Sequence, residues 1–114
     1  MARYEIQFPL TFNDGSLVPE ELFLQVKDEL VARFGGFHVL SPGSPAEGYW
    51  RASKDVLYRD QFQIWRVTTF TTPEDGDAFL KEREFFKEYK KTLEERFKQE
   101  SIWIEVDPWV VPLG

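Results

Sequence analysis

The chain has 114 residues, a formal charge of −6 at neutral pH and no cysteine. This length fits one ordinary domain, and the missing cysteines exclude disulfides, thiolate catalysis and cysteine-ligated metals. The acidic excess disfavours nucleic acid and anionic membranes as partners, because binding to both relies on neutralising phosphate charges. A single histidine, His38, leaves little for a metal site, so we expect no metal and no cofactor.

The start of the chain lacks the basic residues, apolar stretch and cleavage site of a secretory signal. No apolar run approaches the roughly 20 residues that span a membrane. We therefore expect a cytoplasmic protein that makes no membrane contact. A Pro/Gly-rich stretch at 41–48 is too short to divide the chain. We expect a single domain over 1–114, with this stretch as a loop that can act as a lid.

The first half of the chain predicts a strand followed by a helix. Apolar and polar residues alternate strictly from Tyr4 to Phe12, which predicts a strand with one dry face. Turn residues occupy 13–16, and Pro19 with two glutamates is typical of a helix start. Apolar residues then recur at helical spacing until Gly35 and the glycine after it end the helix.

Four further strand stretches and a second helix are expected after this point. A short strand is expected near 37–40, and the β-formers at 49–52 and 56–70 predict two strands joined by a turn. The acidic turn at 72–75 predicts the start of the second helix. The stretch 102–111 predicts a closing strand with prolines near its end.

Four of these five strand stretches and the two helices fit the order β, α, β, β, α, β. This order predicts an α+β, ferredoxin-like fold, with a four-stranded antiparallel sheet and two helices on one of its faces. An irregular α+β sheet of another topology is the alternative. Because the helices cover only one face, the side chains that the strands send to the open face are the candidates for a site.

Tryptophan is the notable residue on the expected open face. Strand alternation places Trp65, Trp103 and Trp109 there, with Phe62, Ile64 and Phe70 on the helix side. Exposed apolar patches of this size usually mark interfaces or ligand grooves. We therefore expect a second copy of the chain to cover the face and enclose an aromatic-lined pocket. The alternatives are a register slip that returns some tryptophans to the core, and a ligand platform on a monomer.

Two charged residues interrupt apolar patterns. Glu82 falls within the apolar stripe of the second helix, and Arg66 falls on the expected inner side of the long strand. Arg66 is either turned outward by a bulge or paired with an inner acid such as Glu82, because an unpaired buried guanidinium is not stable. Glu82 either reaches water where the helix overhangs the sheet, or is a buried carboxylate with a functional role.

Further polar candidates lie around the hairpin, namely Arg51, Tyr58 and Asp60. Charged hairpin residues favour a solvated face, so each is a weaker candidate on its own. Several short phrases resemble those of small bacterial ferredoxin-like proteins: Phe34-Gly35-Gly36, Gly48-Tyr49-Trp50, Tyr58-Arg59-Asp60 and the run 97–103. More loosely, the chain is similar to the dimeric α/β-barrel proteins, which include small monooxygenases, isomerases and ligand-binding modules. The resemblance marks Trp50, Asp60, Glu100 and Trp103 as the first positions to test.

These observations lead to three functional hypotheses. The first is a homodimeric binding or accessory protein with a pocket for a small molecule on the open sheet face. The second is a cofactor-independent isomerase, lyase or monooxygenase that uses Asp60 or Glu82 with Arg51 or Arg66 as the anion partner. The third is an acidic module, of the immunity or antitoxin kind, that masks a basic protein partner.

Overall fold

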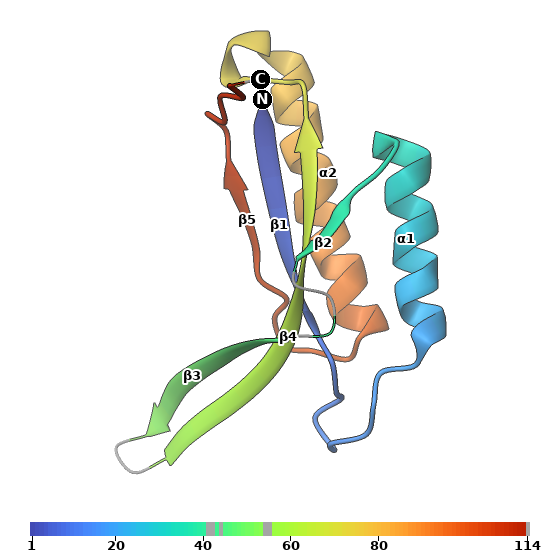
Figure 1. Cartoon of the computed structure of the whole chain (residues 1–114), viewed down its shortest axis with the longest axis vertical. Coiled ribbons are helices and arrows are strands. Elements are labelled where there is room, and N and C mark those ends of the chain that lie inside the picture. Colours follow the sequence, from blue (N-terminus) through green and yellow to red (C-terminus); the bar gives the residue numbers. More distant parts are fainter. Residues whose placement is uncertain (41–42, 44, 54–55, 114) are drawn as a thin grey trace.

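The computed structural model describes residues 1–40, 43, 45–53 and 56–113; within 50–59 it describes only the backbone. This part of the chain forms an antiparallel sheet and two α-helices (Figure 1). A short 3-10 turn precedes the second helix. The elements are β1 (Ala2–Pro9), α1 (Glu20–Phe34), β2 (His38–Leu40), β3 (Ala46–Ser53), β4 (Val56–Thr69), the 3-10 turn (Pro73–Asp75), α2 (Asp77–Arg96) and β5 (Ile104–Asp107).

The sheet is built around the long strand β4. Its strands run in the order β2-β4-β1-β5, and β3 pairs with the other half of β4. Because β1 pairs with β4 only at 62–69, the hairpin of β3 and β4 projects from the body of the molecule (Figure 1). The four-stranded sheet predicted from the sequence differs from the five strands found among the described residues. The difference arises because β2 and β3 both pair with β4 as separate strands.

Both helices pack on the same face of the sheet. In β1, Tyr4, Ile6 and Phe8 are buried, while the residues between them are half-buried. Tyr4 stacks on Phe86 of α2 with the ring centres 3.9 Å apart. Phe8 meets Phe23 of α1 at 5.9 Å. The dry face predicted for the first strand is therefore confirmed, and it forms the floor of the core.

The predicted limits of the first helix agree with the structure. The helix α1 begins directly after Pro19, whose lack of an N–H costs nothing at a helix start. It ends at Gly35, which has the left-handed φ of 83° and donates its N–H to the Val31 carbonyl at 2.9 Å. A residue with a Cβ is disfavoured at such a φ, which explains why a glycine stands at the end of this helix.

Several other predicted boundaries shift. The strand β1 ends at Pro9, three residues before the predicted Phe12. The turn at 72–75 is not the start of α2, because Gly76 with φ 60° redirects the chain before Asp77. The strand β5 ends at Asp107, before Pro108, which cannot donate a backbone hydrogen bond.

The prediction of which β4 residues face the core was wrong. The register pairs Ile6 with Trp65, so Trp65 lies on the helix-covered face and is only 5% exposed. Phe70, expected inside, is 87% exposed. Phe62 and Ile64 alternate with Trp65 and therefore lie on the open side. Both alternating sets of β4 contain apolar residues, so the sequence pattern alone does not choose between the two faces.

Candidate functional site

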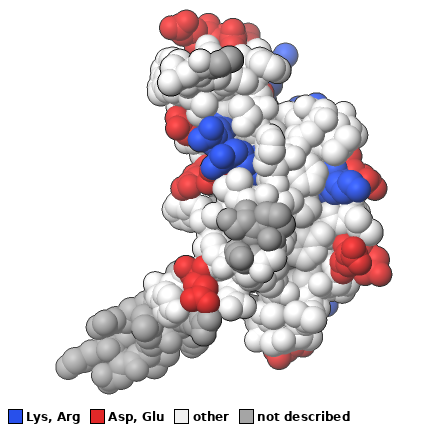
Figure 2. Space-filling view, in the orientation of Figure 1, with Lys and Arg blue, Asp and Glu red and all other residues white. Residues whose placement is uncertain are grey.

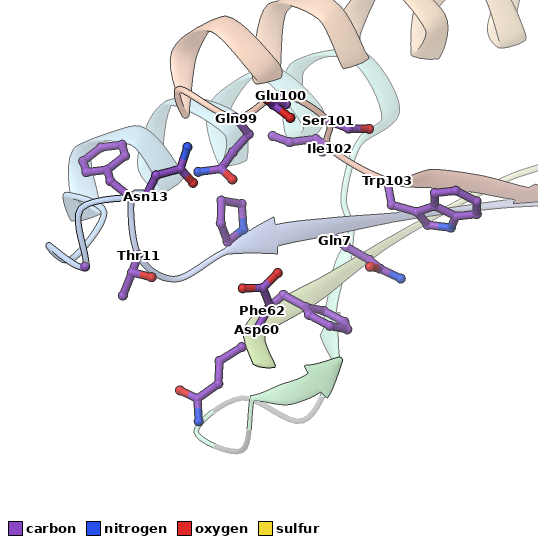
Figure 3. Close-up of a pocket in the computed structure, with 14 residues that line it drawn as sticks. Gln7, Thr11, Asn13, Asp60, Phe62, Gln99, Glu100, Ser101, Ile102 and Trp103 are labelled. Atoms are coloured by element: carbon purple, nitrogen blue, oxygen red, sulfur yellow. The ribbon is translucent and has the colours of Figure 1, made fainter. Parts of the chain in front are cut away.

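A cleft of about 850 Å³ lies at the end of the open sheet face where β1 stops (Figure 3). A volume of this size is typical of sites for small molecules. Three segments distant in sequence meet there: the end of β1 with its following turn, the part of β4 that leaves the body, and the chain between α2 and β5. Its lining residues are Gln7, Pro9, Thr11, Phe12, Asn13, Gly15, Asp60, Gln61, Phe62, Gln99, Glu100, Ser101, Ile102 and Trp103.

The strand register positions the floor of the cleft. Pro9 of β1 pairs with Phe62 of β4, and Asp60 projects from the same side of β4 because it lies two residues from Phe62. In Figure 3 the Asp60 carboxylate points toward the end of β1. The Gln7 N–H donates to the carbonyl of Trp103 at 3.0 Å. This hydrogen bond connects the floor of the cleft to the segment 99–103, which forms one of its walls.

The turn after β1 is held by its own hydrogen bonds. The Phe12 N–H donates to the Ser16 carbonyl at 2.8 Å, and the Gly15 N–H donates to the Phe12 carbonyl at 2.9 Å. Asp14 Oδ1 accepts from the Ser16 N–H at 2.9 Å and also from its hydroxyl. These bonds lower the pKa of Asp14. In Figure 3 the side chain of Asn13 from this turn points toward that of Gln99 on the facing wall.

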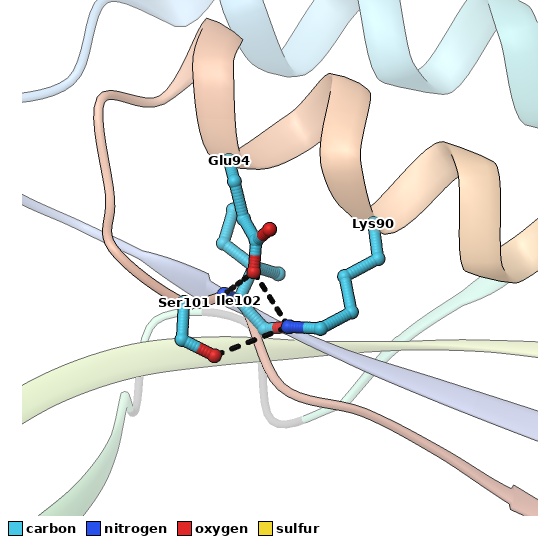
Figure 4. A network of polar contacts seen from close by, with 4 residues as sticks. All are labelled: Lys90, Glu94, Ser101 and Ile102. Atoms are coloured by element: carbon cyan, nitrogen blue, oxygen red, sulfur yellow. Dashed lines mark hydrogen bonds and ion pairs between the residues drawn. The ribbon is translucent and has the colours of Figure 1, made fainter.

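The wall formed by residues 99–103 is fastened to α2 by two side chains (Figure 4). Lys90 Nζ donates to the Ile102 carbonyl at 2.7 Å and to Ser101 Oγ at 3.1 Å. Glu94 Oε2 accepts from the Ile102 N–H at 2.9 Å and from Lys90 Nζ at 2.5 Å. The Lys90 ammonium, together with the Ile102 N–H, holds the pKa of Glu94 below its usual range. We call this pair the Lys90–Glu94 clamp.

The lining combines hydrogen-bonding groups with aromatic rings. It has the carboxamides of Gln7, Asn13, Gln61 and Gln99, the carboxylates of Asp60 and Glu100, and the rings of Phe12, Phe62 and Trp103. Among the described lining residues there is no lysine, arginine or histidine. The lining can therefore accept many hydrogen bonds but offers no cationic partner.

Three of the predicted site residues meet at this cleft. Asp60, Glu100 and Trp103 all line it. Trp103 is 58% exposed, and its indole N–H donates to Glu105 Oε2 at 3.1 Å. This hydrogen bond orients the ring on the open face, where the sequence pattern of the last strand placed it.

Other predictions fall outside the described side chains. Trp50, Arg51 and Tyr58 belong to the β3–β4 hairpin, where the backbone register pairs Trp50 with Tyr58, but their side chains lie outside the described residues. The predicted lid at 41–48 includes 41, 42 and 44, which also lie outside the described part of the chain.

Trp65 lies in the hydrophobic core and not on the open face where the sequence pattern placed it. It stacks on Phe37 with ring centres 4.6 Å apart and packs on Phe8 at 4.9 Å. Its indole N–H donates to Gln63 Oε1 at 3.2 Å, so its polar atom is satisfied within the core. The register slip considered as an alternative is the correct interpretation for this tryptophan.

Arg66 and Glu82 do not form a pair, because they lie on opposite faces of the sheet. Arg66 Nη2 donates to Glu5 Oε1 at 2.7 Å on the open face, and no bulge occurs between β1 and β4 there. Figure 2 shows Lys and Arg atoms gathered over the upper part of the sheet with Asp and Glu atoms beside them. Arg66 and Glu82 are therefore not placed to act together on one substrate, as one form of the enzymatic hypothesis requires.

Glu82 lies on the helix side and is half-buried. Its Oε1 accepts from the hydroxyls of Thr69 and Thr71, both at 2.7 Å. Burial, together with the neighbouring Glu82 carboxylate, raises the pKa of the Tyr4 hydroxyl. Glu82 thus forms hydrogen bonds at one edge of the core, and it does not line the cleft.

Trp109 lies at the other end of the sheet. It follows β5 and is 61% exposed, and its backbone N–H donates to Asp107 Oδ1 at 3.1 Å. The next residue, Val110, exchanges backbone hydrogen bonds with Met1 at 2.9 and 3.0 Å, so the two ends of the chain lie together (Figure 1). The tryptophans predicted for one patch are therefore divided among the core (Trp65), the cleft (Trp103) and the segment after β5 (Trp109).

Sequence reasoning missed most of the polar lining. The sequence identifies Asn13 only as a turn residue, and Gln99 only as part of a stretch that carries a resemblance. Nothing in the spacing of these residues connects them, because they come from opposite ends of the chain. Only a prediction that the turn between β1 and α1 lies beside the connection between α2 and β5 would have placed these residues together.

No group of His, Asp and Glu among the described residues is arranged to hold a metal ion. None of the described helices combines the length and apolar character needed to cross a membrane. Comparison of the chain with family models, curated proteins and solved structures finds no match. The candidate site is therefore defined by its own geometry and chemistry.

Proposed function

We propose that the protein is a binding module that holds a small polar molecule in the cleft of the open sheet face. The observation that carries this proposal is the convergence of Asp60, Glu100 and Trp103 on one cleft of about 850 Å³. Rigid strands form the floor and the Lys90–Glu94 clamp fastens one wall. Such support keeps binding groups in place without a ligand and lowers the cost of binding.

We further propose that the sheet is a ferredoxin-like one related to the dimeric α/β barrels. The strand order β2-β4-β1-β5 supports this, because the two strands that precede the helices, β1 before α1 and β4 before α2, are central neighbours. In this proposal β2 and β3 together take the place of one edge strand that is interrupted between them.

We also propose that a second copy of the chain covers the open face around the cleft. The exposed ring of Trp103 supports this, as do Leu40, Phe62 and Ile64, which are half-buried on the same side. A two-fold symmetric pair would bury this patch against itself. Light scattering at micromolar concentration tests the dimer: a mass of two chains is expected, and a single-chain mass would contradict it.

The binding proposal is tested by screening a library of polar fragments against the full chain by NMR. Binders are expected to shift the resonances of cleft residues, including the Trp103 indole N–H. A Thr11→Trp variant places a large ring at the cleft rim and is expected to abolish these shifts. The matched control, Thr92→Trp, changes an exposed position on α2 and is expected to leave them unchanged. If no fragment shifts cleft resonances, the proposal is wrong.

A further inference from the structure

We propose that the ligand of the cleft is an organic cation with two separated ammonium or guanidinium groups, such as a diamine or a polyamine. This inference rests on the proposed binding function and names the class of ligand. It follows from the charge of the lining, from where its two carboxylates lie, and from the groups between them.

The lining has negative charge with no positive charge among its described members. Asp60 and Glu100 contribute carboxylates. Lys98 is a cation close to the lining, with its Nζ 5.3 Å from the centre of the Phe12 ring. The two carboxylates outnumber this single ammonium. The whole chain carries −6, so its long-range field also attracts cations and repels anions.

The two carboxylates belong to opposite walls. Asp60 is part of β4, and Glu100 is part of the segment that the Lys90–Glu94 clamp fastens to α2. Figure 3 shows the two residues on opposite sides of the end of β1. A ligand with one positive group can meet only one wall closely. A ligand with two positive groups separated by an apolar stem can meet both.

The groups between the carboxylates suit such a ligand. An ammonium group has three donors and no acceptor, and the carboxamide oxygens of Gln7, Asn13 and Gln99 supply acceptors. Aromatic faces attract cations within about 6 Å, and Phe62 and Trp103 provide such faces as well as apolar surface for the stem. A neutral polyol would use the carboxamides equally well but would gain nothing from the carboxylates.

The experiment compares four probes with a similar four-carbon backbone: putrescine, n-butylamine, butanediol and succinate. Each is titrated into the full chain at millimolar concentration, with the cleft resonances followed by NMR. Putrescine is expected to bind most tightly, n-butylamine more weakly, and butanediol and succinate not measurably. The putrescine affinity is expected to fall as salt increases, because the contacts are partly exposed charge pairs.

Variants separate a local effect from the net charge of the protein. Asp60→Asn and Glu100→Gln are each expected to weaken putrescine binding roughly threefold to tenfold, as loss of one partly exposed ion pair implies. The matched controls Asp28→Asn and Glu21→Gln make the same charge change at exposed positions of α1. They are expected to alter the affinity by less than about twofold.

Two results would overturn the inference. One is butanediol or succinate binding as tightly as putrescine; the other is cleft variants that behave like the α1 controls. In either case the binding function stands if the fragment library still shifts the cleft resonances. If putrescine and the library both fail to shift them, the inference and the proposed function are both wrong.

Discussion

The two faces of the sheet are made by alternate residues of the same strands, yet one face forms the core and the other carries the cleft. On the covered face Tyr4 and Phe8 are fully buried under the helices, and Trp65 is almost so. On the open face Glu5 meets Arg66 in a partly exposed ion pair, and the cleft opens beside it. A shift of one residue along a strand therefore separates a group that stabilises the fold from one that is free to bind. Mutations at matched positions on the two faces test this division.

The largest expected difference is between two tryptophans. Trp65→Ala removes a ring packed among Phe8, Phe23 and Phe37, and is expected to lower the free energy of unfolding by about 3–5 kcal/mol. Trp103→Ala is expected to change the unfolding free energy of the single chain by no more than about 0.5 kcal/mol, because that ring is mostly exposed within one chain. Urea unfolding followed by circular dichroism measures both.

Trp65→Phe serves as the control for the first variant, because it keeps an aromatic ring and loses only part of the packing. It is expected to cost less than Trp65→Ala. If Trp103→Ala proves as destabilising as Trp65→Ala, the open face contributes to the core and the division between the faces is wrong.

The next effect concerns the Lys90–Glu94 clamp, which connects the covered side to the cleft. Lys90→Met keeps the apolar stem but loses the hydrogen bonds to Ser101 and Ile102. A loss of about 1–2 kcal/mol of unfolding free energy is expected, together with shifted resonances along 99–103. The control Lys91→Met removes an exposed lysine paired with Glu88 at 3.4 Å, and should do neither. Unchanged resonances in Lys90→Met would show that the clamp does not position the wall.

A smaller, pH-dependent effect is expected where the two helices meet. Hydrogen bonds from Arg96 and Tyr89 lower the pKa of Glu29. Since the folded-state pKa lies below the unfolded value of about 4.3, this contribution is present above that value and is lost as the pH falls through the folded pKa. The Glu29 side chain is 38% exposed, so solvent screening limits the effect to about 1 kcal/mol or less.

Urea unfolding of Glu29→Gln measured from neutral to acidic pH checks this. The variant is expected to be less stable than the original chain at neutral pH, and the difference is expected to shrink as the solution becomes acidic. Glu88→Gln, an exposed position on α2, is the control. A difference that stays constant with pH would show that the charge of Glu29 is not the cause.

The smallest expected effect is on the open face. The Glu5–Arg66 pair lies across neighbouring strands with side chains 19% and 28% exposed. A double-mutant cycle with Glu5→Gln and Arg66→Met is expected to give a coupling of about 0.5–1 kcal/mol. The coupling should decrease in high salt. The exposed Glu84–Lys87 pair is expected to give less, and an equal value for both pairs would contradict the role of partial burial.

Sequence reasoning succeeded where the signal was local. Pro19 and Gly35 mark the ends of α1 because each acts through its own backbone geometry. It failed on β4, because Phe62 and Ile64 on one face of the strand are as apolar as Trp65 and Val67 on the other. The sequence indicates Asp60, Glu100 and Trp103 as candidates, but separately, from a hairpin, a resemblance and a strand pattern.

By itself, the sequence determined the α+β class, the dry face of β1 and the ends of α1, since these depend on residues within a few positions of one another. Only the tertiary structure decided which side of β4 faces the helices, and that Gln99 lies opposite Asn13 across one cleft. The physical reason is that the choice of face depends on strand register, and the cleft on contacts between distant segments. Hydrogen bonds such as that from Lys90 to Ile102 form only after those segments have packed.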